Sequence, residues 1–463
     1  MQKYHTHTLP NGLRIIHLPS ASPVVYCGYQ IAAGTRHEAP GEEGMAHFCE
    51  HITFKGTQRR NALQIINALE RVGGELNAFT NKEDTTYYAA IHRDHFSRAA
   101  DLLTDIVFNS QYPQAEIDKE VDVICDEIES YNDTPAELIF DEFENIIFEG
   151  HPLGHNILGK AEQLRTYTTA DALRFVHRHY RPDNAVFFVY GDIEFQKVIK
   201  NLSPSPSPKE RGVYSSAANS SVGNSSAGNS SVGNSSAGNI SVGNSSAGNS
   251  SAGNSSVGNS SVGNSSADKC NHSPLLGRGV GGEVITRHLQ THQAHVMMGC
   301  RAYDIHHPRR IALYLLNNLL GGPGMSSRLN LSLRERHGLV YTVESTMVCY
   351  GDTGLWAVYF GCDPTDVNKC CRLVRRQLDR LMQRPLGKTQ LAAAKQQLKG
   401  QIAIACDNRE QFALDFGKSF LHYGWEKSVD ELLRQIDAVS ADDLQQVACE
   451  LFGADRLTTL IFN

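Results

Sequence analysis

The sequence predicts an α+β protein made of two similar α/β-sandwich domains, each a mostly antiparallel sheet flanked by helices. Strand patterns and helix patterns come in separate blocks, which is typical of α+β folds and not of doubly wound α/β folds. The same order of blocks occurs twice, which indicates a duplication. The 463 residues exceed one ordinary hydrophobic core and favour two or three domains.

Residues 1–201 form the first predicted domain. Residues 4–18 have the pattern of two strands around a turn at Asn11-Gly12, a common hairpin signal. The other expected strands are 24–31, 75–80, 85–92 and 185–192. The expected helices are 44–55, 61–72, 96–109, 113–131, 135–147 and 169–179.

Residues 202–282 are predicted to be a disordered Asn/Ser/Gly-rich linker. They begin with SPSPSPKERG and continue through repeats of NSSVG and NSSAG. Such a composition contains almost no apolar mass that could offset the entropy lost on ordering the chain. The tract therefore separates two independently folded parts.

Residues 283–463 form the second predicted domain and repeat the order of the first. Strands are expected in 283–300, 339–347, 354–361 and the final LTTLIF. A helix is expected over 308–320, before Gly321-Gly322, and long helices are expected up to about residue 453.

Bulk composition excludes several classes of function. A formal net charge of −7 argues against nucleic acid or an anionic membrane as the main partner. No apolar run approaches the ~18 residues of a membrane span, and the first residues lack the pattern of a signal peptide. The eleven cysteines are an odd number without a disulfide framework. These features predict a cytoplasmic protein.

The segment GMAHFCEHITFKG carries the strongest chemical signal. Gly44 and Gly56 bound a short helical pattern whose apolar residues share one face, the side expected to face the core. His47, Glu50 and His51 fall on the opposite face. Two imidazoles four residues apart can bind one tetrahedral metal, and the carboxylate between them suits a general base for a water molecule at that metal. The alternative is an amphipathic helix with a solvated His/Glu face.

A catalytic zinc site requires a third protein ligand, and a later helix offers two candidates. In QAEIDKEVDVICDEIESYNDTP the apolar residues form one buried stripe. Glu120 and Glu127 lie at the edge of that stripe, two turns apart, whereas Asp126 and Glu129 point toward solvent. Each half-buried carboxylate needs a partner, which is either a metal with its histidine shell or an Arg or Lys side chain.

Taken together, these residues resemble the pitrilysin–insulinase peptidases, in the short two-domain form of the bacterial and processing-peptidase-like members. HFCEHITFKGT is similar to the inverted zinc motif of that family, and EVDVICDE to its E-x6-E segment. The resemblance implies Zn²⁺ bound by His47, His51 and Glu127, with Glu50 as general base and Glu120 supporting the site. Cys49 stands where an aliphatic residue is commoner and, on the core face, is expected to be an inert buried thiol.

Two further segments extend the resemblance. GGELNAFTNKEDTTYY resembles the edge strand on which Asn77 and Ala78 would pair with substrate backbone by β-strand addition. GGPGMSSRLNLSLRERHGLVYTVES resembles the segment in which Arg334 positions substrate and Tyr341 donates a hydrogen bond to the developing oxyanion. Without the resemblance, Arg334 would be a surface ion pair and Tyr341 a strand core residue.

The resemblance implies a zinc metalloendopeptidase that hydrolyses unstructured peptides. Because larger members form a closed chamber from four such domains in one chain, this two-domain chain is expected to form a homodimer. We expect neither nucleic acid nor membrane as a partner. The alternatives are a non-catalytic scaffold or assembly subunit of the same fold, and a zinc ion bound purely for structure.

Overall fold

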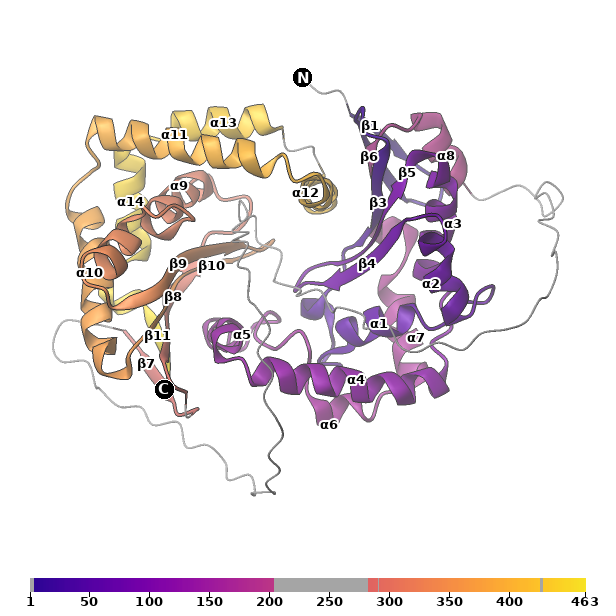
Figure 1. The fold of residues 1–463 in the computed structure, drawn as a ribbon, viewed down its shortest axis with the longest axis horizontal. Helices are drawn as coiled ribbons and strands as arrows, with labels where there is room; N and C mark the ends of the chain where they lie inside the picture. Colours follow the sequence, from indigo (N-terminus) through magenta and orange to yellow (C-terminus); the bar gives the residue numbers. More distant parts are fainter. Residues whose placement is uncertain (1–3, 204–281, 290, 425–427) are drawn as a thin grey trace.

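The computed structural model describes residues 4–203, 282–289, 291–424 and 428–463. These residues form two halves that lie side by side, each with one sheet and its own layer of helices (Figure 1). The predicted α+β class with two similar α/β units is confirmed. The predicted disordered linker lies, apart from its first and last residues, outside the described part of the chain.

The first sheet has six strands in the order β1-β2-β6-β3-β5-β4. Only the β2–β6 pair is parallel, and β4 forms one edge of the sheet. The strands are β1 (His5–Thr8), β2 (Arg14–Pro19), β3 (Val24–Ile31), β4 (Glu75–Thr80), β5 (Thr85–His92) and β6 (Ala185–Gly191).

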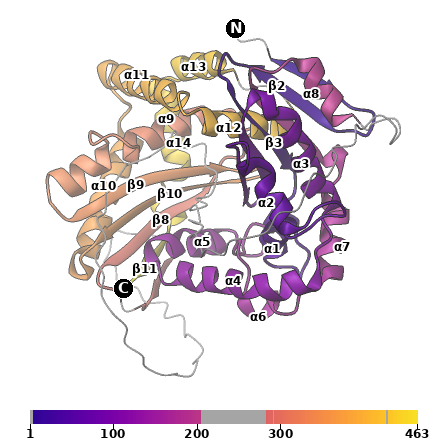
Figure 2. The same ribbon diagram turned by 45° about the vertical axis from the view of Figure 1, so that its right-hand side comes forward.

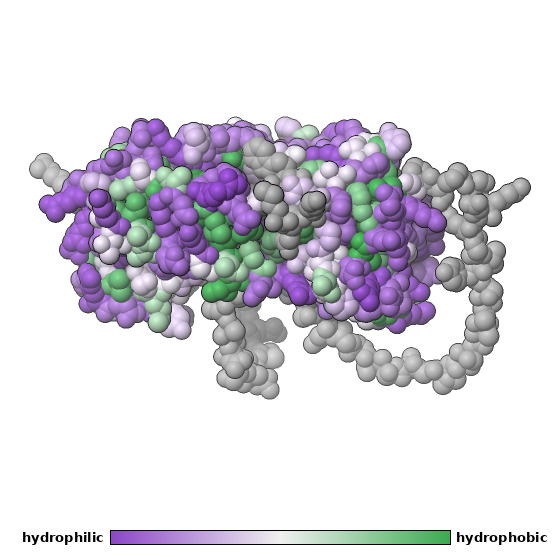
Figure 3. All heavy atoms as spheres, turned by 90° about the horizontal axis from the view of Figure 1, so that it is seen from above, coloured by the Kyte–Doolittle hydropathy of each residue, from purple (hydrophilic) through white to green (hydrophobic). Residues whose placement is uncertain are grey.

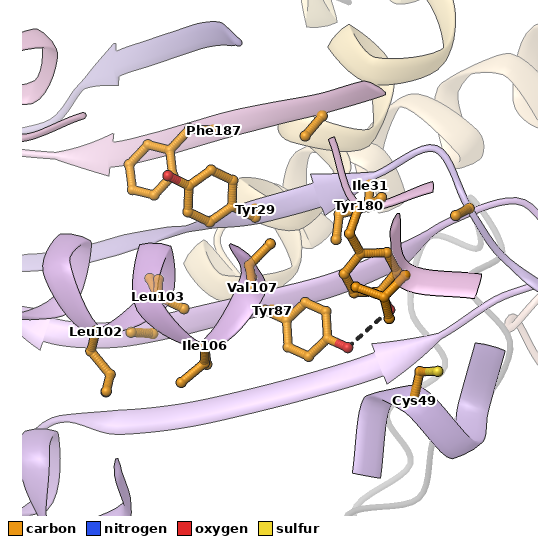
Figure 4. Packing of buried hydrophobic residues seen from close by; sticks show 14 of the residues in the cluster. Tyr29, Ile31, Cys49, Tyr87, Leu102, Leu103, Ile106, Val107, Tyr180 and Phe187 are labelled. Carbon is orange, nitrogen blue, oxygen red and sulfur yellow. Dashed lines mark hydrogen bonds between the residues drawn. The ribbon is translucent and has the colours of Figure 1, made fainter. Parts of the chain in front are cut away.

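The helices of the first half are α1 (Met45–Thr53), α2 (Ala62–Glu70), α3 (Phe96–Asn109), α4 (Gln114–Asn132), α5 (Pro135–Ile147), α6 (Ala161–Leu164), α7 (Thr169–His179) and α8 (Phe195–Leu202). Apart from α5, they lie on one face of this sheet (Figure 1). Figure 4 shows aromatic side chains from the strands meeting aliphatic residues of α3 in the core. Within this core the hydroxyl groups of Tyr87 and Tyr180 lie 3.0 Å apart, so each buried phenol has a partner.

The second sheet has five strands in the order β7-β11-β8-β10-β9. The β7–β11 pair is parallel and the other pairs are antiparallel, so the topology repeats that of the first sheet without β1. By this correspondence β9 is the counterpart of β4, and each is an edge strand. The strands are β7 (Val284–Arg287), β8 (Ala294–Ala302), β9 (Val340–Cys349), β10 (Gly354–Cys362) and β11 (Thr458–Phe462).

The helices of the second half follow the same order. They are α9 (Arg310–Gly321), α10 (Val367–Gln383), α11 (Lys388–Ala405), α12 (Arg409–Tyr423), α13 (Val429–Ala438) and α14 (Ala441–Leu451), together with a π-helix at Asn330–Glu335. The strands predicted within residues 283–300 are β7 and β8, and β8 extends two residues further, to Ala302.

The two halves exchange one helix each (Figures 1 and 2). Helix α5, from the first half, packs on the second sheet, where Ile139 and Phe143 join a core with Tyr359 and Leu460. Helix α12, from the second half, packs on β6 and β3 of the first sheet. Each sheet is therefore covered on one face by its own helices and on the other by a helix of the opposite half.

The face seen from above is predominantly hydrophilic, with smaller apolar areas scattered among the polar residues (Figure 3). No helix among the described residues is long and apolar enough to cross a membrane.

Candidate metal centre

Helix α1, which carries the H-x-x-E-H residues, is fixed at its N-terminus. Gly44 has a φ of 87°, and a Cβ there would lie 2.8 Å from the Cα of Gly159, so the close approach of these two backbones requires glycine. The buried carboxylate of Glu38 accepts hydrogen bonds from the N–H groups of Gly44 (3.0 Å) and Ala46 (2.8 Å). These bonds satisfy N–H groups that have no partner inside the helix.

His155 completes this cap, since its Nε2 lies 3.0 Å from Glu38. Sequence reasoning missed both residues. A Glu six residues before Gly44 and a His in a loop gave no periodic signal that would connect them to α1.

His47 and His51 project from α1 toward α4. Their rings lie 4.6 Å apart between centroids. His47 is 5% exposed, and His51 is half-buried. One turn of helix therefore presents two imidazole groups to the same space, as the helical pattern predicted.

Glu127 on α4 meets both histidines. Its Oε2 lies 3.4 Å from His51 Nε2 and 3.8 Å from His47 Nε2. Ligand atoms of the three residues all lie within 4.8 Å of one another, the only such group of three or more metal-binding side chains in the described part of the chain. Two imidazole nitrogens and one carboxylate oxygen are a donor set that suits catalytic zinc.

Glu120, two turns before Glu127, contacts the other nitrogen of His51. Its Oε1 lies 3.3 Å from His51 Nδ1, and its Oε2 lies 2.6 Å from Lys55 Nζ. Both alternatives considered for this carboxylate therefore apply, because it pairs with a lysine and also with a histidine of the cluster. By engaging Nδ1, Glu120 leaves Nε2 of His51 directed at Glu127, an arrangement that fixes the orientation of a metal-binding imidazole.

The pKa values reflect this environment without a metal. Burial, together with the neighbouring His51, lowers the pKa of His47 to about 3. Burial alone would lower the pKa of His51 too, but hydrogen bonds with Glu120 and Glu127 outweigh it and raise the pKa to about 9. The same contacts hold the pKa values of Glu120 and Glu127 below their ordinary value despite burial. Without a metal, the cluster thus favours a neutral His47, two ionised carboxylates and a protonated His51, so a bound cation would have to displace the proton of His51.

Glu50 lies on the same face of α1 but is held by the sheet. Its Oε2 accepts a 2.6 Å hydrogen bond from the hydroxyl of Thr80, the last residue of β4. Glu50 is 9% exposed, and burial raises its pKa to about 7, within the range that suits a general base near neutral pH. Sequence reasoning missed Thr80, because its contact with Glu50 depends on how α1 packs against β4.

The residues expected to stay outside the site do so. Cys49 is fully buried on the core face of α1, and burial raises the pKa of its thiol well above the ordinary value. Asp126 and Glu129 are exposed on α4. Glu120 and Glu127 are half-buried and these two are exposed, as the apolar stripe of the helix predicted.

The strand that bears Asn77 and Ala78 is at the sheet edge. Strand β4 pairs with β5 on one side only, and α1 packs close to it. Its free edge therefore offers backbone groups to an extended peptide beside the cluster.

Arg334 and Tyr341 lie next to each other, but the structure does not bring them to the cluster. The Arg334 guanidinium lies over the Tyr341 ring, 5.7 Å from its centroid. Tyr341 is 82% exposed, so it is no core residue of β9, and it lies near the end of β9 opposite the hairpin that touches the first half. Their predicted roles remain predictions.

The second half has no equivalent cluster among its described residues. On α9, which packs against β9 as α1 does against β4, the buried Asn317 takes part in an amide network. Its amide donates to the Ser345 carbonyl at 3.1 Å, and its Oδ1 accepts from Trp356 Nε1 at 3.1 Å. The second half therefore has the same fold as the first, but its helix α9 carries no metal-binding side chains at the position that corresponds to α1.

Comparison with known sequences matches two family models to the chain. The family model "Insulinase (Peptidase family M16)" matches residues 15–161, and "Peptidase M16 inactive domain" matches residues 260–398. An uncharacterized zinc protease of Streptomyces coelicolor is 32% identical over 451 residues, covering 96% of this chain and 86% of the relative. The chain belongs to the insulinase family of peptidases, family M16.

Other relatives of this M16 chain cover nearly all of it. An uncharacterized zinc protease of Bacillus subtilis is 29% identical over 457 residues, covering 98% of this chain and 97% of the relative. The solved structure of a protease from Helicobacter pylori matches the fold with a TM-score of 0.79 at 20% identity, covering 100% of both chains. A structure described as a peptidase M16 inactive domain from Pseudomonas fluorescens gives 0.75 at 15% identity, covering 99% of this chain and 97% of the other.

Proposed function

We propose that this M16 protein is a zinc-dependent endopeptidase that hydrolyses unstructured peptides or peptide segments. The observation that carries this proposal is the convergence of His47, His51 and Glu127 within 4.8 Å, with Glu50 beside them. The relatives from Bacillus subtilis and Streptomyces coelicolor are also named as zinc proteases, which supports zinc as the metal.

The three converging side chains would hold the metal, and Glu120 would orient His51 through Nδ1. Zinc bound here would supply Lewis-acid polarisation of a scissile carbonyl and of water, whose pKa such sites lower to about 7. The donor set fits this role, since three protein ligands leave one coordination position open.

Glu50 is the proposed general base. It would take a proton from the attacking water and pass it to the leaving amine. The hydrogen bond from Thr80 fixes one carboxylate oxygen, which leaves the other free to exchange the proton. Burial of Glu50 keeps its basicity in the range where both transfers are possible near neutral pH.

The free edge of β4 is the proposed peptide-binding strand. An extended peptide would pair with the backbone at Asn77 and Ala78, which places its peptide bonds beside α1. Main-chain pairing makes little demand on side chains, so the enzyme would accept many sequences that are unfolded.

The second half would contribute Arg334 and Tyr341. In this role Tyr341 donates a hydrogen bond to the developing oxyanion and Arg334 positions the substrate. Because the described positions of these residues show no contact with the cluster, the proposal requires the halves to move toward each other. Association of two chains as a homodimer would enclose the space between the halves and exclude folded proteins.

The decisive experiment compares wild type with Glu50→Gln for zinc content and for cleavage of a mixture of unstructured peptides. We expect both proteins to bind about one zinc and only the wild type to cleave, with a loss of at least about 100-fold in the variant. A wild type without zinc, or equal activity in both proteins, would refute the proposal and favour a scaffold role.

A matched pair of variants tests the ligand set. Glu127→Gln is expected to lose zinc, whereas Glu129→Gln, two residues away on the exposed face of α4, keeps it. Loss of zinc in both variants would show that any substitution on this part of α4 disturbs the site, and it would not support Glu127 as a ligand.

A further inference from the structure

A cavity between the two halves has the polar groups of a binding site for a peptide end. We propose that it binds the carboxyl terminus of a peptide whose last residues are apolar, a proposal that rests on the peptidase function above. Its volume is about 460 Å³, within the range of ligand sites.

The cavity lies next to the turn that follows the proposed peptide-binding strand. Its walls come mainly from α9, α11, α12 and β9 of the second half. Residues 81–83 of the first half also line it, and they directly follow the last residue of β4. A peptide near the edge of β4 can therefore place one end in this cavity.

Most of the lining is apolar. Ile305, Ile402 and Phe416 are buried side chains that face it, and Met347 is partly buried beside them. Such walls favour aliphatic or aromatic side chains, whose transfer from water contributes about 25 cal/mol per Å² of buried apolar surface.

Two groups on α9 are suited to an anion. Arg310 and Tyr314 are four residues apart, so they lie on the same face of the helix, and both line the cavity. The Arg310 guanidinium has no hydrogen bond or ion pair with any described residue, and the Tyr314 hydroxyl is buried without a hydrogen-bond partner. A carboxylate between them would accept hydrogen bonds from both and satisfy the buried hydroxyl.

The other cations of the cavity are already engaged. Lys418 lies 3.1 Å from Asp84, and Lys82 donates to the Leu153 carbonyl and lies 3.8 Å from Glu144. Arg310 is therefore the cation available to a ligand in the described part of the cavity.

A hydrogen-bond acceptor on α11 favours a peptide as the ligand over a carboxylic acid that has no peptide bond. Gln401 on α11 lines the cavity, and its side-chain oxygen is buried without a partner. It can accept the N–H group of a peptide bond, which a simple fatty acid lacks. Asp415, which accepts from Gln411, also lines the cavity near Tyr314. The Arg310 charge must offset its repulsion of the terminal carboxylate, so acidic last residues, which add a second negative charge, are disfavoured.

The test measures binding of one fluorescent ten-residue peptide ending in Leu-Phe, as a free acid and as a carboxyl-terminal amide. Fluorescence anisotropy is measured on full-length Glu50→Gln protein, alone and combined with Arg310→Gln, Tyr314→Phe, Gln401→Met or, as a control, Arg376→Gln on the exposed face of α10. We expect the amide to bind about 10-fold more weakly than the acid. Arg310→Gln should weaken only the acid, to the level of the amide, while Arg376→Gln changes neither.

Arg310→Lys, which keeps the charge, guards against a folding defect and should retain most of the preference for the acid. Equal binding of acid and amide, or equal weakening of both by Arg310→Gln, would overturn the proposal. The proposal would also be overturned if laurate displaces the peptide and binds the Gln401→Met variant as tightly as the parent protein. In that case the cavity would bind a fatty acid and not a peptide. These measurements need no turnover. If the wild type cleaves no peptide while the Glu50→Gln protein prefers the free acid, the peptidase function is refuted and the cavity assignment stands.

Discussion

At the scale of single residues, the hydroxyl of Thr80 is expected to control Glu50. Removal of the 2.6 Å hydrogen bond in Thr80→Val should leave Glu50 free to rotate and should lower kcat about 10-fold, with zinc content unchanged. Thr86→Val is the matched control, because Thr86 is buried in the neighbouring strand and its hydroxyl has no partner. Equal losses in both variants would show a packing effect.

Glu120 gives a second test at this scale. It holds His51 through Nδ1, so Glu120→Ala should weaken zinc binding by about 10–100-fold without removing a ligand. Zinc affinity measured by competition with a chelator checks this. Glu116→Ala, one turn earlier on α4 where the side chain pairs only with Lys119, should bind zinc as wild type does.

The residues that sequence reasoning found and those it missed differ in one physical respect. Each of His47, Glu50, His51 and Glu127 lies on a helix whose periodicity shows which way its side chain points, and the family resemblance selected Glu127 over Glu120 as the ligand. Thr80 and Glu38 act on α1 from other segments. Their contacts depend on the packing of elements, which periodicity does not specify.

At the scale of elements, the same limit explains the exchanged helices. The sequence predicted the helix at 135–147 that forms α5, whereas for the region of α12 it predicted only long helices up to about residue 453. An apolar face does not show which sheet will cover it, since both sheets offer similar surfaces. The predicted domain boundaries, 1–201 and 283–463, therefore divide the chain in sequence, whereas packing divides it with one helix exchanged each way.

The exchange predicts a large stability effect from one α5 residue. Phe143 is fully buried under the second sheet, so Phe143→Ala should lower the free energy of unfolding by about 3–5 kcal/mol. Urea denaturation followed by circular dichroism measures this. Glu137→Ala, exposed on the same helix, should change stability by less than about 0.5 kcal/mol. A loss below about 1 kcal/mol for Phe143→Ala would contradict the packing described for α5.

At the scale of the whole molecule, a buried ion cluster joins the halves. Asp84, after β4, lies 3.1 Å from Lys418 and 3.0 Å from His422, both on α12. Burial alone would raise the pKa of Asp84, but the Lys418 charge and the His422 contact outweigh it and hold the pKa well below its ordinary value of 3.8. The junction between the halves is therefore sensitive to acid.

The sign of this effect follows from the lowered pKa. The ionised form of Asp84 stabilises the fold at pH values above its unfolded pKa of about 3.9, and this contribution is lost as pH falls toward the folded value. Asp84→Asn should be less stable than wild type above about pH 5, and the difference should shrink below about pH 4. Thermal melts of both proteins across this range measure the difference, and a gap that stays constant would refute the assignment.

The final whole-molecule prediction concerns which chain supplies Tyr341. Tyr341 lies eight residues along β9 from Cys349, which places it roughly 26 Å from the hairpin end that meets the first half. It can reach a metal site in two ways: the halves of one chain close on each other, or a partner chain supplies it. We expect closure within one chain, since both residue sets are present on it. Tyr341→Phe should then lower kcat by about 100-fold. A mixture of the Tyr341→Phe and Glu50→Gln proteins should show no more peptidase activity than the sum of the two proteins measured separately. Recovery toward roughly a quarter of wild-type activity on mixing would mean that a partner chain in a dimer supplies the tyrosine. Light scattering on each protein, run alongside, establishes whether a dimer is present.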